Sequence, residues 1–173
     1  DLELTISIAG YQFPDSDNCH DADWLNVDIL CTCRGKTFKS RDPSLVTTEL
    51  KRISEWFRAI SQNKIPEWIT LGFTEPNIEF VLLRNYRGEV RFNVLLSHES
   101  KPPFTTNDWD ESNYNWEDPD DLFYAPFEYS FEQMSEYAQK FMSLSDAFPE
   151  RECPEQNEGS TKHFDQRVKQ RFS

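Results

Sequence analysis

Residues 2–8 read Leu2-Glu3-Leu4-Thr5-Ile6-Ser7-Ile8, and apolar and polar side chains alternate through them without a break. A period of two places every apolar side chain on one face of an extended chain, so this stretch predicts a half-buried β-strand. The same period returns over residues 25–33, and the Arg34-Gly35 turn leads to a short third strand at residues 36–39. The chain is therefore expected to begin with three strands.

Two amphipathic helices are expected to cover these and later strands. Asp42-Pro43 suits a helix entrance, because Asp accepts hydrogen bonds from the first free amides and Pro fits the first helical position. Apolar residues then recur at spacings of three and four as far as Ile60, which predicts a helix over residues 43–63. A capping box, Ser130-Phe131-Glu132-Gln133, opens the second helix, expected over residues 130–148.

Further strands are expected between the helices. They cover residues 68–73, 78–83, 89–96 and 123–129, with a hairpin turn at Arg87-Gly88 and an edge position for the strand that contains Pro126. Residues 1–149 are therefore predicted to form a single α+β domain, a mostly antiparallel sheet packed with two main helices. Residues 150–173 are polar with balanced charge, and we expect a mobile tail or one that is helical over residues 162–171.

Charge and composition exclude several classes of protein. The chain has 31 acids and 18 bases, a formal net charge of −13, and this field would repel phosphates on a nucleic acid or an anionic membrane. No apolar stretch approaches the roughly 18 residues of a membrane span, and residues 1–25 lack the pattern of a signal peptide, so we expect a cytoplasmic protein. The charge favours either a cationic partner or solubility alone.

Motifs of catalysis and metal binding are missing from the sequence. His20, His98 and His163 fall in different expected elements, and no nucleophile elbow, phosphate loop or glycine fingerprint is present, so we expect no enzyme. Cys31 and Cys33 occupy the apolar side of their strand, and with Cys19-His20 upstream they lack the spacing of paired zinc ligands. Buried, reduced thiols without a disulfide, and no metal or other cofactor, are expected.

The most unusual segment is residues 107–121, which hold seven acids, no base and three large aromatic residues. An EF-hand is excluded, because Asn113 and Pro119 stand where that loop needs Gly and a bidentate Glu. Two interpretations remain: a solvated loop, or a binding surface whose carboxylates replace phosphates and whose rings act as anchors. We favour the second, and the candidate partner-binding residues are Asp108, Trp109, Asp110, Glu111, Tyr114, Trp116, Glu117, Asp118, Asp120 and Asp121.

Secondary candidates for partner binding are Glu75 and Glu79, around the Glu75-Pro76-Asn77 turn. As a pair of carboxylates they could serve acid–base catalysis. No poised partner for such chemistry is evident in the sequence, so a turn followed by a solvated strand residue is expected, and the turn is the place to seek the interface if the acidic run does not bind.

Several stretches together resemble the WapI family of bacterial immunity proteins. They are Gly10-Tyr11-Gln12-Phe13-Pro14, residues 23–27, residues 45–60 and above all Phe73-Thr74-Glu75-Pro76-Asn77-Ile78-Glu79-Phe80. The resemblance covers about residues 2–148 and leaves out the acidic run around residues 108–121 and the tail.

This resemblance implies a small cytosolic protein of contact-dependent growth inhibition. Its partner would be the C-terminal nuclease domain of a wall-associated toxin, neutralised by one-to-one inhibition, and no catalytic residues are implied. The negative charge suits such a cationic nuclease domain. The alternative is a non-enzymatic acidic interaction domain for another basic protein partner.

Overall fold

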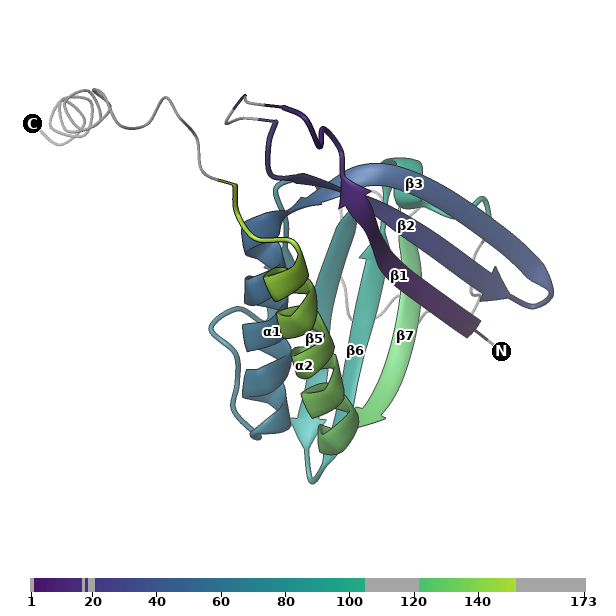
Figure 1. Ribbon diagram of the computed structural model, residues 1–173. Coiled ribbons are helices and arrows are strands. Elements are labelled where there is room, and N and C mark those ends of the chain that lie inside the picture. The colour runs from purple at the N-terminus through teal and green to yellow at the C-terminus, as the bar shows by residue number, and fades with distance from the viewer. Residues whose placement is uncertain (1, 17, 19–20, 105–121, 152–173) are drawn as a thin grey trace, which may run out of the picture.

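The computed structural model describes residues 2–16, 18, 21–104 and 122–151, which form two β-sheets and two main helices. Figure 1 shows their arrangement. The first sheet has the order β1 (Leu2–Tyr11), β2 (Trp24–Cys33), β3 (Lys36–Val46); the second has the order β4 (Thr70–Gly72), β5 (Ile78–Tyr86), β6 (Glu89–Leu96), β7 (Phe123–Ser130). The helices are α1 (Thr47–Ser61), α2 (Phe131–Ala147) and the short 3-10 helix η1 (His98–Ser100). All described pairings are antiparallel, so the predicted α+β class is confirmed, with the strands divided between two sheets.

The first sheet follows the alternation of its sequence. Leu4 lies opposite Cys31 in the pairing of β1 with β2, and the apolar side chains of both strands share one face. That face is half-buried along β1 and buried along β2, where both cysteines are inaccessible, as the alternation predicts. Burial, with a smaller contribution from Cys33, raises the pKa of the Cys31 thiol to about 11.

The first helix begins later than the sequence predicts. Asp42 and Pro43 lie within β3, which continues to Val46, so the helix start at residue 43 and the strand end at residue 39 were wrong. β3 is an edge strand, where the missing N–H of Pro43 costs no ladder hydrogen bond. The helix is opened instead by Glu49, whose carboxylate accepts a hydrogen bond from the Val46 amide at 2.9 Å.

An aromatic core forms where the two helices cover the second sheet. The Phe57 ring of α1 lies 5.8 Å from Phe80 of β5, Phe92 of β6 and Phe141 of α2, measured between ring centroids. The helices also join through Ser54, whose hydroxyl donates to the Ala138 carbonyl oxygen at 2.7 Å. Phe57 therefore connects both helices to the sheet, and the helical stripe predicted from the sequence is confirmed as core.

The second helix begins at the predicted capping box. Ser130 Oγ accepts from the Gln133 amide at 3.2 Å, and the Gln133 side chain accepts from the Ser130 amide at 2.9 Å. Neither of the main helices in the described part of the chain is long and apolar enough to cross a membrane.

Within the described residues, contacts with the domain continue past α2 to Arg151, the last residue of that part of the chain. Its guanidinium lies 4.4 Å from the centroid of the Tyr11 ring, and its amide donates to Asp23 Oδ1 at 2.9 Å. The Arg151 guanidinium also donates to the backbone oxygens of Phe13, Pro14 and Ala22. Arg151, which lies past the boundary expected between residues 149 and 150, therefore contacts the domain. The remainder of the expected tail, residues 152–173, lies outside the described residues.

Candidate partner-binding surface

The candidates in the acidic run lie outside the described residues, because that part of the chain falls within residues 105–121. They are Asp108, Trp109, Asp110, Glu111, Tyr114, Trp116, Glu117, Asp118, Asp120 and Asp121. The flanks of the run are described: the rings of Phe104 and Phe123 meet edge to face at 5.9 Å. The described residues on either side of the run therefore lie close together at the start of β7.

The secondary candidates lie near the start of β5, and both are half-buried. Burial raises the pKa of the Glu79 carboxyl, and burial together with Glu79 raises the pKa of Tyr124. The buried polar centre of this turn is Asn77, whose side-chain amide donates to Asp42 Oδ2 at 2.8 Å. The turn thus joins β3 to the second sheet, and the specific sequence Phe73–Phe80 has a clear structural role.

The segment between α1 and β4, residues 62–69, exposes large apolar side chains. The exposed fraction is 79% for Ile65, 61% for Trp68 and 56% for Ile69. The strand expected over residues 68–73 was wrong in extent, because only Thr70–Gly72 pairs as β4. Because β4 begins only at Thr70, Trp68 and Ile69 precede the strand, and the sheet does not bury their side chains.

The backbone of this α1–β4 segment is nevertheless fixed to the domain. The Trp56 indole N–H donates to the Trp68 carbonyl oxygen at 2.9 Å, and the Leu82 amide donates to the Ile69 carbonyl oxygen at 2.9 Å. Nearer the start of the segment, the Asn85 side chain donates to the Lys64 carbonyl oxygen at 3.2 Å. A fixed backbone that presents exposed Trp and Ile side chains has the character of preorganised contact residues, since little ordering entropy remains to be lost on binding.

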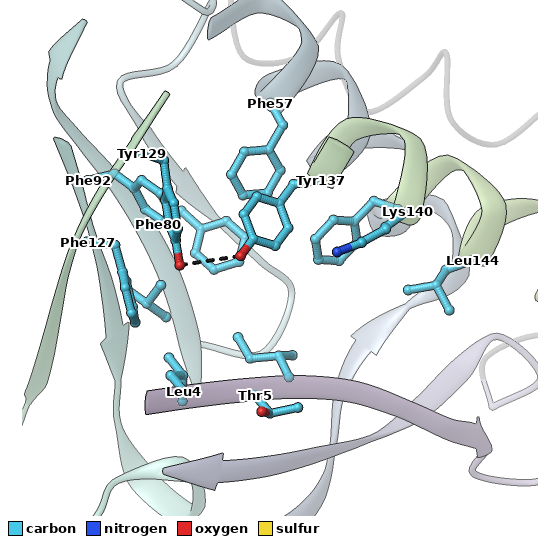
Figure 2. Close-up of a pocket in the computed structure, with 13 residues that line it drawn as sticks. Leu4, Thr5, Phe57, Phe80, Phe92, Phe127, Tyr129, Tyr137, Lys140 and Leu144 are labelled. Carbon is cyan, nitrogen blue, oxygen red and sulfur yellow. Dashed lines mark hydrogen bonds between the residues drawn. The ribbon is translucent and has the colours of Figure 1, made fainter. Parts of the chain in front are cut away.

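A different apolar feature is a groove of about 400 Å³ between β1, the second sheet and α2. Figure 2 shows the side chains that line it. Its walls are largely aromatic, and the Tyr137 hydroxyl donates to the Tyr129 hydroxyl at 3.3 Å. Burial raises the pKa of Tyr129. The charged group at the groove is the Lys140 amine, 5.2 Å from the centroid of the Tyr137 ring. A cation at this position makes the groove a poor match for a basic partner.

A family comparison identifies the group of proteins to which the chain is related. The model of the Immunity protein WapI-like family matches residues 1–149. The chain belongs to this family. The resemblance seen in the sequence is thereby confirmed, and the matched range contains every strand and both main helices of the described part of the immunity protein. No curated protein and no solved structure matches the chain.

The family assignment supports an immunity role and a toxin as partner. Within the described residues, no group of three or more His, Cys, Asp or Glu side chains is placed to hold a metal ion. The exposed α1–β4 segment is the surface that sequence reasoning missed. The available signal was Ile65-Pro66-Glu67-Trp68-Ile69, which alternates with neither the period of a strand nor that of a helix.

Proposed function

We propose that this immunity protein binds the C-terminal nuclease domain of a contact-dependent, wall-associated toxin and neutralises it in a one-to-one complex. The observation that carries the proposal is the family match over residues 1–149. A nuclease must attract phosphates and is therefore basic where it binds its substrate. The net charge of −13 on the immunity protein complements such a surface.

Inhibition of this kind needs both rapid encounter and slow release. The acidic run is the proposed source of the first, because a concentrated negative field steers a cationic domain and raises the association rate. Exposed apolar residues on a fixed backbone, such as Trp68, are suited to the second, because buried anchors mainly determine the dissociation rate.

The direct test is a titration of the toxin domain's nuclease activity with the immunity protein. One-to-one inhibition predicts a linear loss of cleavage that ends at a molar ratio of one. Complete loss at a small fraction of that ratio would indicate that the protein acts with turnover. Unchanged cleavage at excess immunity protein, with no complex in size-exclusion chromatography, would overturn the proposal.

A second test addresses the acidic run. Changing Asp108, Asp110, Glu111, Glu117, Asp118, Asp120 and Asp121 to Asn or Gln should slow association about ten- to a thousandfold at low salt, and less at high salt. The matched control neutralises seven other exposed acids: Glu3, Asp15, Glu99, Glu132, Glu136, Asp146 and Glu150. Equal slowing in both variants would assign the effect to net charge alone and would refute a site in the run.

A further inference from the structure

A concave site of about 270 Å³ lies beside the α1–β4 segment. Helix α1, the segment and β4 contribute its lining, which consists of Arg52, Glu55, Trp56, Ala59, Pro66, Glu67, Trp68 and Leu71. Trp56, Pro66 and Leu71 are buried and provide an apolar floor, whereas the Trp68 ring is largely exposed. The hydrogen bond from the Trp56 indole to the Trp68 carbonyl oxygen fixes the backbone of this part of the lining.

Two carboxylates give the site its charge. Glu55 on α1 and Glu67 on the segment are exposed, and neither belongs to an ion pair within the described part of the chain. Arg52 is the cation of the lining, but its guanidinium is engaged elsewhere. It donates to the Gly72 carbonyl oxygen at 3.3 Å and lies 3.7 Å from the Glu49 carboxylate.

This combination matches the side chain of lysine or arginine. The long methylene stem of such a side chain packs on apolar surface, and its charged head seeks aromatic faces and carboxylates. The site offers all three within one small volume. The groove of Figure 2 differs in this respect, because its charged group is Lys140.

We propose that this site receives a lysine or arginine side chain of the toxin domain, while Ile65, Trp68 and Ile69 pack around the point of entry. The inference rests on the proposed function, which supplies a cationic protein as partner. A second copy of the chain is disfavoured as occupant, because two molecules with a net charge of −13 repel each other.

The test compares two variants with the wild type by surface-plasmon kinetics against the purified toxin domain. Glu55→Gln/Glu67→Gln removes the charges and keeps the shape, and we expect the affinity to fall about ten- to a hundredfold. Trp68→Ala should raise the dissociation rate by a similar factor with little dependence on salt. Its backbone anchor is retained, because the Trp56 indole binds the carbonyl oxygen of residue 68 and not its side chain.

The matched control is Glu132→Gln/Glu136→Gln, which neutralises two exposed acids of α2. Wild-type binding in this control and weakened binding in the Glu55/Glu67 variant support the site. Wild-type affinity in the Glu55/Glu67 variant overturns the site, even where the wild type inhibits the toxin. Failure of the wild type itself to bind refutes the proposed function instead.

Sedimentation of the protein without toxin tests whether a second copy of the chain occupies the site instead. A dimer of the wild type that Trp68→Ala dissociates would assign the surface to self-association and overturn the inference. A wild type that remains monomeric at high concentration supports a foreign partner.

Discussion

The α1–β4 segment and the groove between β1 and α2 use similar residues in opposite ways. In the segment, the carbonyl oxygens of Lys64, Trp68 and Ile69 accept hydrogen bonds from the domain, and the apolar side chains face outward. In the groove, aromatic side chains from α1, α2 and the second sheet converge on a shared space, as Figure 2 shows. Residue type alone therefore does not decide burial. Burial also depends on whether the backbone, as it is held by its hydrogen bonds, turns the side chain toward the domain or toward solvent.

The largest expected difference between the two regions is in the stability lost on truncating one side chain of each. Phe57 represents the core, because its ring contacts both the second helix and the second sheet. Phe57→Ala should lower the free energy of unfolding by about 3–5 kcal/mol, because it removes a buried ring and leaves a cavity. Trp68→Ala should lower it by less than about 0.5 kcal/mol, because an exposed side chain is removed. Urea denaturation measures both. Equal losses would show that the α1–β4 segment is part of the core.

A second contrast lies between two carboxylates of α1. Glu49 is 2% exposed and accepts from the Val46 amide and from the amide and hydroxyl of Thr74. Glu49→Ala leaves these donors unpaired and should cost about 2–3 kcal/mol of unfolding free energy. Glu55→Gln, on the exposed face of the same helix, should change it by less than about 0.5 kcal/mol. A cost below about 1 kcal/mol for Glu49→Ala would mean that water replaces its contacts.

A smaller effect is expected at the end of the described chain. A protein that ends at Pro149 loses the contacts of Arg151 with Tyr11, Asp23 and the loop after β1, and should be about 1–2 kcal/mol less stable to urea. A protein that ends at Arg151 keeps those contacts and serves as the control. Equal stability of the two truncations would show that the Arg151 contacts are negligible in solution.

The last expected effect concerns pH. The pKa of Cys31 is raised to about 11 in the folded protein, above the value of an exposed thiol. Between about pH 9 and 11 the unfolded chain therefore releases this proton while the folded chain keeps it, and stability falls as pH rises. Cys31→Ala should flatten this part of the stability curve relative to the wild type. An unchanged slope would assign the pH dependence to other groups, such as Tyr124 and Tyr129, whose pKa values burial also raises.

The strands and the core stripes of the helices could be predicted, because alternation and helical spacing report burial directly. Asp42-Pro43 misled the prediction since the same pair is compatible with a helix entrance and with an edge strand, and only tertiary pairing decides between them. The anchoring of Arg151 has no local signal, because its partners lie more than a hundred residues earlier in the chain.

The candidate surface was harder still to predict. Trp68 and Ile69 have the composition of a strand, and their exposure depends on how far β4 pairs with β5. Nothing in the segment itself encodes that length. The acidic run was visible at once from its composition, and its role stays a prediction.

The positions of the sheet edges bear on aggregation. β3 carries Pro43 and β7 carries Pro126, while β4 pairs over only three residues, so these edges offer little for another chain to extend. β1 is different within the described residues, because its ten residues contain no proline, although a bulge interrupts its pairing with β2 between Ile8 and Gly10. Any growth of a cross-β assembly from the folded protein would therefore begin at β1, and Glu3 with the overall charge of −13 opposes it.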